Sequence, residues 1–439
     1  MSFTPTRAGR AALAVAAAGL LLSTAACGGS DSSSSSNDPN AKVTMTLWTN
    51  STTGPGVKYF KDAAAAYHAT HPKVTIKVQS VQNEDLDGKL QTALQAGKGT
   101  APDLFLQRGG GKLQAMVDAN QVLDISDSIS ADARTNVSAG AWNTENVDGK
   151  TYAMPVDILP GGFWYSKDLF SKAGITAPPT SLAELEAANT KLTAAGVAPI
   201  AVGGKDAWPA AHWYYWFALR ECSQQTLNDT AKSLKFDDAC WTKAGDDLQA
   251  FAKTKPFQEG FLNTSAQQGA GSSAGLVANH KAGSELMGAW DPGVIASLTP
   301  DQKPLKDLGY FPFVSVPGGA GDQTAMMGGA DGYSCSAWAP KAQCTDFLNF
   351  LVTADQQKAY ATAFQSIPVN KVAQSTVADP TLRAAMDAAN KAPYISMWLD
   401  TLYGQNVGNA LNTAVVNMLA GKGSVAEIVD SVNQAAAKG

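Results

Sequence analysis

A strand–helix–strand pattern near the start of the chain constrains the fold most strongly. In "VTMTLW", Val43 to Trp48, alternate residues are apolar, as in a half-buried strand. "KYFKDAAAAYHATHP", Lys58 to Pro72, then keeps apolar residues at helical spacing, and "KVTIKVQSV", Lys73 to Val81, alternates again. Strand, helix and strand within about 40 residues predict a right-handed crossover between parallel strands. The chain must therefore build an α/β fold.

Similar patterns continue along the chain. "LDGKLQTALQAGKG" at 86–99 predicts a helix that ends at glycine, and "PDLFLQ" at 102–107 predicts a short buried strand, which extends an open α/β sheet. From Tyr152 the pattern restarts with two strands and a short helix, and two amphipathic helices split by Gly421 to Gly423 end the chain. With 439 residues and 45% hydrophobic content, the chain is long enough for two large lobes with separate cores.

A leader precedes these elements. Arg7 and Arg10 form a short positive region, and an apolar run of roughly a dozen residues separates them from the small residues Ala25 and Ala26. This layout predicts a secretory signal over residues 1–26, because the run is too short for a membrane-spanning helix of about 20 residues.

Cys27 stands directly after this leader. The small residues before it resemble the bacterial lipobox, in which the cysteine is lipid-modified and becomes the new N-terminus, although Thr24 replaces the usual leucine. The alternative is an ordinary cleavage site with an incidental cysteine. Residues 27–40 are rich in glycine, serine and aspartate, and they predict a flexible tether because they bury too little apolar surface to offset the entropy of ordering.

Export changes the interpretation of the other cysteines. The sequence has 5 cysteines, so four remain when Cys27 is set aside, and an even number in an oxidising compartment predicts disulfides. Sequence neighbours are the simplest partners, which pairs Cys222 with Cys240 and Cys335 with Cys344, each bond stabilising the fold by about 2 to 3 kcal/mol. Other pairings stay open. Neither pair has the two-residue spacing of a zinc knuckle, which argues against the rival metal site.

The charge argues against nucleic acid as a partner. The formal net charge is -5, and the leader carries arginines but no acid, so the exported part is more negative still. Affinity for nucleic acid comes from a clustered positive surface. No second apolar segment of membrane length follows Leu22, so we expect the lipid alone to hold the protein at the membrane.

Several stretches, in this order, resemble the carbohydrate-binding solute receptors of ABC importers, the maltose-binding-protein-like group. They are the lipobox, "LWTN", the helix ending in "HP" before "VTIKV", "LQTALQAGKGTAPDLF", "YAMPVD", "FWYSKDLFSKAGITAPPTSLAEL", "MGAWDPG", "SIPVN" and "LAGKGSVAEIVDSV". Ser166 and Leu182 depart from the asparagine and tryptophan that are common in the family. The resemblance implies a two-lobed periplasmic-binding-protein-like α/β fold with an inter-lobe hinge and a ligand cleft.

The resemblance also implies where the lobes lie and what the cleft contains. Lobe one takes residues 41–153 and 325–366, and lobe two takes residues 154–324 and 367–439. A sugar ring has polar edges and faces of C–H bonds. Its binding cleft therefore needs flat aromatic surfaces for the faces, with carboxylates, amides and arginine for the hydroxyls.

Candidates in lobe one stand at the carboxyl ends of predicted strands, where open α/β sheets bind ligands. Trp48 and Asn50 follow the first strand, Asn83 follows the second, and Gln107 ends the third. The alternatives are that Trp48 fills the core and that Asn83 only caps a helix. These side chains therefore form one candidate edge of the cleft.

Candidates in lobe two and at the crossings come from short motifs. Trp290 in "GAWDPG" matches a family position that often stacks on sugar, and Asp291 beside it offers an acceptor for a hydroxyl. Asp157 follows "YAMPV" near the first crossing, and Asp331 lies in "MGGADGYSC". Trp208 in the glycine-flanked loop "GGKDAWPA" is expected to be exposed and to bind sugar. A structural turn or a strand junction is the alternative for the two carboxylates.

Other motifs are weak. Helical spacing in "HWYYWFALREC" favours core packing, with Trp213 the only cleft candidate. The pattern G-x-S-x-G at 271–275 matches a nucleophile elbow, but no apolar strand precedes it and His280 follows too early. "GGGKL" lacks the hydroxyl residue and the glycine spacing of a P-loop. His68 and His71 lack a nearby third metal ligand. We expect no catalytic residue, no metal and no cofactor.

The sequence thus predicts a monomeric, extracytoplasmic, lipid-anchored receptor that binds a di- or oligosaccharide and docks on the transmembrane subunits of an ABC importer. The tryptophan-rich candidate set favours more than one stacked ring. The resemblance is best to xylobiose-type or related plant-polysaccharide receptors, with amino-sugar, maltose-type and cellobiose-type ligands open. The rivals are a secreted glycoside hydrolase, which needs two carboxyl groups across the sugar, and a carbohydrate-binding scaffold.

Overall fold

The computed structural model describes residues 38–438. The predicted signal over 1–26, Cys27 and the tether through residue 37 lie outside the described residues. Among residues 38–438, no helix combines the length and the apolar character needed to cross a membrane.

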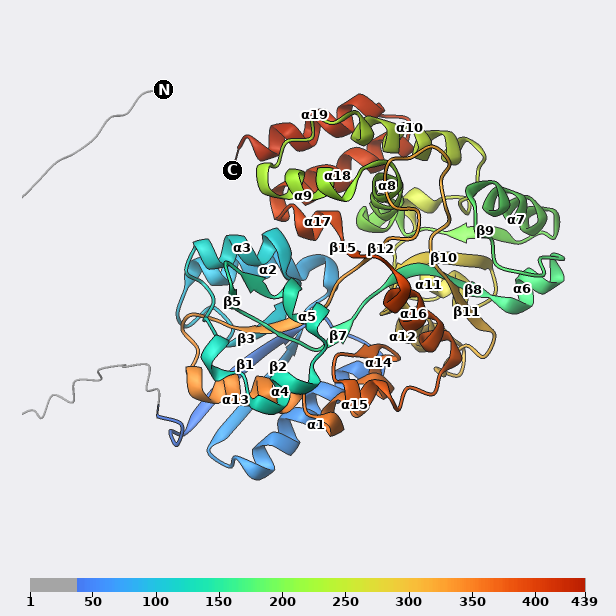
Figure 1. Ribbon diagram of the computed structural model, residues 1–439. Helices are drawn as coiled ribbons and strands as arrows, with labels where there is room; N and C mark the ends of the chain where they lie inside the picture. The colour runs from blue at the N-terminus through green and yellow to red at the C-terminus, as the bar shows by residue number, and fades with distance from the viewer. Residues whose placement is uncertain (1–37, 439) are drawn as a thin grey trace, which may run out of the picture. The chain divides into compact units, whose positions relative to one another are not determined.

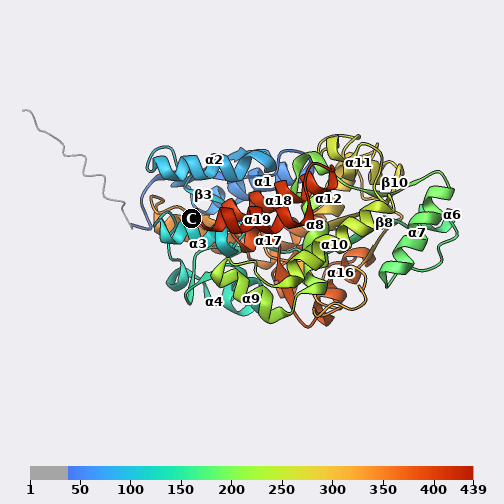
Figure 2. The ribbon, with the colours of Figure 1, turned by 90° about the horizontal axis from the view of Figure 1, so that it is seen from above.

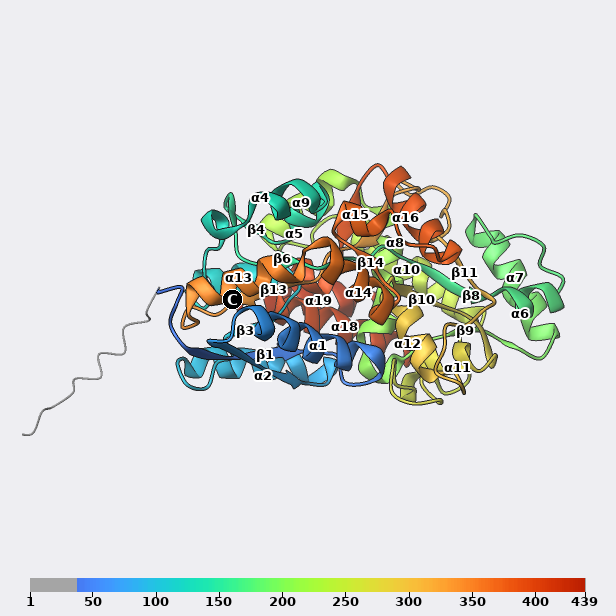
Figure 3. The same ribbon diagram turned by 90° about the horizontal axis from the view of Figure 1, so that it is seen from below.

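A five-stranded sheet in the order β2–β1–β3–β13–β6 forms the centre of the first lobe. Its strands are β1 (Val43–Thr49), β2 (Val74–Ser80), β3 (Leu104–Gln107), β6 (Met154–Pro155) and β13 (Gly332–Cys335). β1 runs parallel to both β2 and β3, which confirms the parallel sheet predicted from the strand–helix–strand pattern. β13 is antiparallel to β3 and β6, and Figure 3 shows it beside β3. A segment from far along the chain therefore completes this sheet.

Helices cover the first sheet because each has an apolar face. α1 (Gly54–Thr70) connects β1 to β2 and buries side chains at helical spacing, as predicted: Phe60, Ala63, Ala64 and Tyr67. It lies beside α13 (Lys341–Leu351) and α14 (Ala354–Phe364) (Figure 3). The other helices packed in this lobe are α2 (Asn83–Ala96), α3 (Gly110–Asp118), α4 (Ala131–Asn136), α5 (Ala139–Thr144) and α15 (Lys371–Gln374). The short strands β4 (Asn146–Val147) and β5 (Lys150–Thr151) pair with each other.

A second sheet in the order β11–β8–β10–β9 forms the centre of the second lobe. Its strands are β8 (Gly161–Ser166), β9 (Ala198–Ala201), β10 (Ala282–Gly288) and β11 (Leu308–Phe311). β10 is parallel to β9 and antiparallel to β8, so the sheet is mixed. Figures 1 and 2 show the C-terminal helices α18 and α19 packed beside α10. The helices of this lobe are α6 (Lys167–Lys172), α7 (Leu182–Ala194), α8 (Trp208–Glu221), α9 (Gln224–Ser233), α10 (Ala239–Lys253), α11 (Ser273–Ala278), α12 (Asp291–Leu298), α16 (Pro380–Lys391), α17 (Leu399–Leu402), α18 (Gln405–Leu419) and α19 (Val425–Ala436).

Helix α8 lies inside the second lobe and is buried along almost its whole length. Trp213 is 1% exposed and stacks on Phe251 with ring centroids 5.1 Å apart. Trp216 and Phe217 are fully buried as well. The core packing expected for this helix is therefore confirmed, and Trp213 belongs to the core rather than to a cleft.

Arg220 on the same helix is buried, and no carboxylate among residues 38–438 forms an ion pair with it. Its guanidinium donates to the carbonyl oxygens of Phe313 (3.0 Å), Val314 (3.1 Å), Asp322 (3.2 Å) and Ala325 (2.8 Å). Burial lowers its pKa to about 10, an effect that Tyr394 and Asp322 oppose. The arginine thus anchors the segment that leads from β11 toward β12 (Met326–Gly328) by satisfying backbone acceptors inside the lobe.

Paired segments carry the chain between the two sheets. β7 (Asp157–Ile158) lies between β6 and β8 and is antiparallel to β14 (Ile367–Pro368). The crossing from β12 to β13 lies alongside, since the Leu159 N–H donates to the Gly329 carbonyl at 2.9 Å and the Val156 N–H to the Asp331 carbonyl at 2.8 Å. β12 also pairs with β15 (Ile395–Met397). These hydrogen-bonded crossings form the hinge between the lobes.

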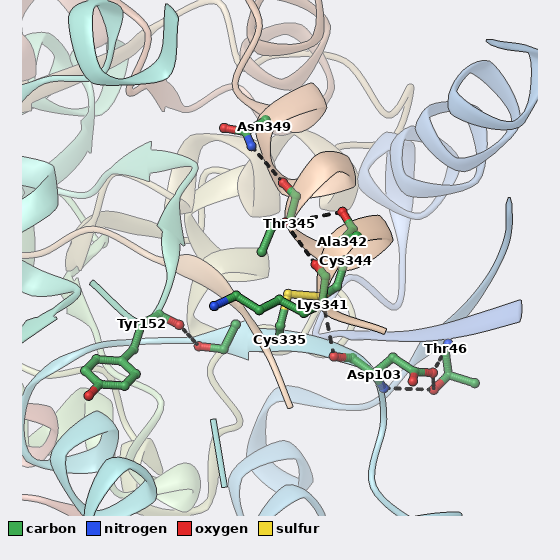
Figure 4. Close-up of a disulfide and its surroundings, with 10 residues drawn as sticks. Thr46, Asp103, Tyr152, Cys335, Lys341, Ala342, Cys344, Thr345 and Asn349 are labelled. Carbon is green, nitrogen blue, oxygen red and sulfur yellow. Dashed lines mark hydrogen bonds between the residues drawn. A yellow bond between two sulfur atoms is a disulfide. The ribbon is translucent and has the colours of Figure 1, made fainter. Parts of the chain in front are cut away.

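Two disulfides have the pairing predicted from the sequence. Cys222, directly after α8, is bonded to Cys240 in α10, and Cys335 in β13 is bonded to Cys344 in α13. Figure 4 shows the second bond, where Cys344 Sγ lies 3.8 Å from the carbonyl oxygen of Asp103. This bond links β13, the strand of the first sheet that comes last in the sequence, to α13, which packs against it.

Candidate functional site

A cavity of about 1320 Å³ lies between elements of the two lobes. Pockets for drug-sized ligands have volumes of about 300 to 1,000 Å³, so this cavity has room for a ligand larger than one sugar ring. The first lobe contributes strand-end and helix-start residues, including Asn50, Asn83, Asp87, Arg108 and Lys112. The hinge contributes Asp157 and Asp331, and the second lobe contributes aromatic and polar residues, including Trp208, His212, Trp290, Trp398, Asp400 and Gln405.

Four aromatic residues form one wall of the cavity, which we call the aromatic wall: Trp208, His212, Trp290 and Trp398. His212 stacks on Trp398 with ring centroids 4.3 Å apart, and Trp290 meets Trp398 edge to face at 5.6 Å. Trp208 meets Trp290 in the same manner at 6.1 Å. These contacts hold each ring against its neighbours, so the four rings form one continuous surface.

The polar atoms of the aromatic wall are hidden within it. The Nε1 atoms of the three tryptophans and Nδ1 of His212 are buried and have no hydrogen-bond partner in the structure. Burial also lowers the pKa of His212 to about 4, although Asp400 opposes this shift, so the imidazole is neutral at physiological pH. The wall therefore presents uncharged, carbon-rich ring surface, which suits the C–H faces of a sugar.

A charged network forms the facing part of the first lobe. Asp87 accepts from Arg108 Nη1 at 3.1 Å and from Lys112 Nζ at 2.7 Å, and Arg108 Nη2 donates to Asn83 Oδ1 at 2.6 Å. Burial alone would raise the pKa of Asp87, but the two cations lower it to about 2. The network is thus ionised over the physiological range, and it holds the Asn83 side chain at the cavity.

Two carboxyl groups enter the cavity from the hinge. Asp157 accepts from the Tyr360 hydroxyl at 2.7 Å and from the Asp331 N–H at 3.0 Å. Burial raises the pKa of both Asp157 and Asp331, and the charge of Asp331 raises that of Asp157 further. Carboxyl oxygens placed this way can accept hydrogen bonds from ligand hydroxyls, and both groups belong to the segments that cross between the lobes.

The structure brings most of the sequence-predicted residues together. Asn50, Asn83, Asp157, Trp208, Trp290 and Asp331 all line the cavity. Trp208 is half-buried, because it packs against His212 and Trp290, rather than exposed as its loop suggested.

Three predicted residues, Trp48, Gln107 and Asp291, are not among the lining residues. The half-buried Trp48 packs against both hydrophobic clusters of the first lobe. Gln107 Oε1 accepts from the Arg108 N–H at 2.8 Å and the Gly109 N–H at 3.2 Å, which fixes the backbone turn just before α3. These two side chains have structural partners that account for their positions.

Asp291 lies behind Trp290, inside the second lobe. It and Glu285 are fully buried, and among the described residues the Asp291 carboxyl group has no hydrogen-bond partner. Burial raises the pKa of Asp291 to about 8, which favours its neutral form. A buried, uncharged carboxyl group cannot act on a ligand in the cavity directly.

Sequence reasoning missed several lining residues: Arg108, Lys112, His212, Trp398 and Asp400. The rule that ligands bind at the carboxyl ends of strands predicted Gln107. The residue that lines the cavity is Arg108, one position later. His212 carried a helical-spacing signal that indicated core packing. Trp398 precedes the short helix α17, and no local pattern marked it.

The motifs for other chemistries have structural explanations. Ser273, the serine of the 271–275 pattern, is fully buried and donates to the Ala266 carbonyl at 3.1 Å, so it is not an exposed nucleophile. His68 Nδ1 lies 2.6 Å from the Val74 carbonyl, and His71 stacks on Tyr67. In the described part of the chain, one group brings three ligand atoms of metal-binding type within 4.8 Å of one another, away from the cavity lining: Asp168, His280 and Asp307.

Comparisons with known proteins point to one family. The sequence pattern of the family described as bacterial extracellular solute-binding protein matches residues 50–358. The melibiose/raffinose/stachyose-binding protein of Bacillus subtilis is 23% identical over 331 residues, 74% of this chain and 73% of that protein. The lactose-binding protein of Rhizobium radiobacter is 26% identical over 326 residues, 72% of this chain and 71% of that protein.

Solved structures share the fold. A protein from a study of xylan utilization by Caldanaerobius polysaccharolyticus aligns with a TM-score of 0.81 at 24% identity and covers 89% of this chain and 99% of its own. A chitin oligosaccharide binding protein aligns with a TM-score of 0.81 at 22% identity and covers 90% of this chain and 98% of its own. Both similarities extend across the two lobes and the hinge.

Proposed function

Because the chain belongs to the bacterial extracellular solute-binding protein family, we propose that it captures a di- or oligosaccharide and delivers it to the transmembrane subunits of an ABC importer. The observation that carries the proposal is the lining of the cavity, which combines the aromatic wall with carboxyl and amide groups. Flat apolar rings match the C–H faces of a sugar, and the polar groups match its hydroxyls. Relatives named for binding melibiose, raffinose, stachyose and lactose support the same ligand class.

The proposed contacts are the predicted residues that line the cavity together with neighbours found beside them. We assign stacking to Trp208, Trp290 and Trp398, and hydrogen bonding to the set Asn50, Asn83, Arg108, Asp157 and Asp331. We assign a supporting role, without ligand contact, to Trp48, Gln107 and Asp291. Gln107 positions the backbone of Arg108, and Asp291 directly follows Trp290.

The membrane attachment is a proposal from the sequence. We propose signal cleavage after residue 26, a lipid on Cys27 and a tether over 27–40, which would hold a monomeric receptor outside the cytoplasm near its importer. The proposed lobes are 41–153 with 325–366, and 154–324 with 367–439. At these borders β6 and α15 pack with the first lobe, and β12 packs with the second. Replacing Cys27 by serine should release the protein from the membrane fraction; retention in that fraction would contradict the anchor.

A thermal-shift screen tests the ligand class and separates the rivals. The panel contains xylobiose, cellobiose, maltose, lactose, melibiose, raffinose and a chitin disaccharide. Ligand binding raises stability by RT ln(1 + [L]/Kd), so a bound sugar at 100 times its Kd adds about 2.7 kcal/mol. Catalytic turnover of a panel sugar would indicate a glycoside hydrolase, and no saturable response to any soluble sugar would favour a scaffold.

The charges of the cavity predict that the ligand is not anionic. Four carboxyl groups line it besides Asp157 and Asp331, whose raised pKa disfavours their charged form, against the two cations Arg108 and Lys112: Glu84, Asp87, Asp206 and Asp400. Both cations are already paired with Asp87. A uronic-acid disaccharide should therefore bind at least about tenfold more weakly than its neutral counterpart, because like charges repel at close range.

Calorimetric titration of cellobiose and cellobiouronic acid at low and high salt would measure this difference. Added salt should narrow it, since salt screens the repulsion. Tighter binding of the uronate would show that Arg108 and Lys112 dominate the cavity and would contradict the prediction.

A further inference from the structure

The triple glycine Gly109 to Gly111, which begins α3, has no role in the proposed sugar contacts. In the structure its second and third residues lie against the α17–α18 turn of the second lobe. A Cβ added at Gly111 would come within 2.7 Å of the Gly404 nitrogen and 2.8 Å of the Leu402 carbonyl oxygen. These neighbours are backbone atoms, which cannot rotate away as a side chain can. The two lobes therefore meet here backbone to backbone.

Gly110 makes the same contact from the adjacent position. A Cβ there would lie 2.8 Å from the Thr401 carbonyl oxygen and 2.5 Å from Met397 Sδ. Its φ of +58° is also in the left-handed region, which glycine adopts without strain. Both the path of the chain and the close approach of the second lobe require glycine at this point.

The contact borders the cavity on both sides. Arg108 and Lys112 line the cavity from the first lobe, and Asp400, Thr401 and Gln405 line it from the second. Asp400 is held within its own lobe because Asn412 Nδ2 donates to it at 3.2 Å, and Asn412 in turn accepts from the Tyr215 hydroxyl. The rim of the second lobe is thus a fixed surface rather than a free loop.

Two polar interactions across the cavity accompany this contact. Burial would lower the pKa of Arg108, but nearby carboxylates raise it, among them Asp400 from the opposite lobe. Gln268 Nε2 of the second lobe donates to Glu84 Oε2 of the first at 3.1 Å. Both Glu84 and Gln268 are exposed and line the cavity, so their hydrogen bond joins the lobes at its edge.

We infer that Gly110 and Gly111 form a seat, a backbone surface on which the α17–α18 turn closes. Saccharide binding requires that neither position carries a side chain. The inference rests on the proposed function, because a ligand held between the lobes is bound fully only when both lobes reach it. A side chain on the seat keeps the lobes apart without touching the ligand. The glycines are therefore positioning residues for the binding site.

The test compares Gly111→Ala with Gly140→Ala. Gly111 lies in α3 and has no positive φ, and alanine favours a helix, so the ligand-free variant should be as stable as the wild type. Gly140 lies in α5, and an added Cβ there would have no atom within 4 Å, which makes it the matched control. For the panel sugar that binds the wild type most tightly, we expect Gly111→Ala to bind at least tenfold more weakly and Gly140→Ala to bind normally.

A distance measurement separates failure of the seat from failure of the proposed function. In a Cys27→Ser background, nitroxide labels at the exposed positions Lys89→Cys and Lys232→Cys report on lobe separation without any ligand. Gly111→Ala should lengthen the mean distance, and Gly140→Ala should not. If no panel sugar binds the wild type, the proposed function fails. The ligand-free distance still shows whether a side chain at position 111 separates the lobes. An unchanged distance, or wild-type affinity in Gly111→Ala, would overturn the inference.

Discussion

Replacing Trp290 by alanine is expected to weaken saccharide binding about 30-fold or more, which corresponds to about 2 kcal/mol, the threshold for a dominant contact residue. Trp290 touches both Trp208 and Trp398 in the aromatic wall. Its removal takes away a stacking face and also the support that keeps two other rings in place. Calorimetric titration with the tightest-binding panel sugar measures the loss.

Two further variants make this result interpretable. Trp290→Phe keeps an aromatic face and should lose much less affinity than the alanine variant. Trp338→Ala removes a tryptophan of the first lobe that packs against Gly97, outside the cavity lining, and should leave affinity unchanged. Equal affinity of Trp290→Ala and wild type would show that the aromatic wall does not bind the sugar.

Replacing Arg220 by methionine is expected to lower the free energy of unfolding by about 3 kcal/mol or more. The change leaves three buried backbone carbonyls, those of Phe313, Val314 and Ala325, without the arginine donor, and an unsatisfied buried polar group costs about 1 to 3 kcal/mol. The guanidinium also lies over the Trp216 ring, 5.4 Å from its centroid, so packing is lost together with the hydrogen bonds. Urea unfolding of the ligand-free protein measures the difference.

The matched control is Arg134→Met, at an exposed arginine on α4. Surface substitutions of this kind change stability by about 0.5 kcal/mol or less. If Arg220→Met unfolded at the same urea concentration as the control, the buried guanidinium would not be holding the segment between β11 and β12.

Much of the fold could be predicted because local patterns and the final packing agree. The alternation over Val43 to Trp48 and the helical spacing from Phe60 to Tyr67 both continue into the buried core of the first lobe. The two predicted C-terminal helices are likewise present as α18 and α19, and Gly421 to Gly423 lie between them as expected. The return of β13 beside β3 had no local signal, because it depends on pairing between segments more than 200 residues apart.

The site was less predictable because its parts meet only in three dimensions. The rule that ligands bind at strand ends located Asn50 and Asn83 at the cavity, since each follows a parallel strand. The same rule could not tell Gln107, whose side chain bonds to the backbone before α3, from its neighbour Arg108, which lines the cavity. His212 and Trp398 come from distant parts of the chain and stack only in the folded protein.

The central claim is that the cavity binds a saccharide and leaves it chemically unchanged. Isothermal titration of the purified receptor with each panel sugar, followed by analysis of the recovered sugar, tests both parts in one experiment. The account predicts saturable binding of a neutral di- or oligosaccharide with one site per chain, and recovery of the intact sugar. Absence of binding by every sugar in the panel, or recovery of cleavage products, would contradict it.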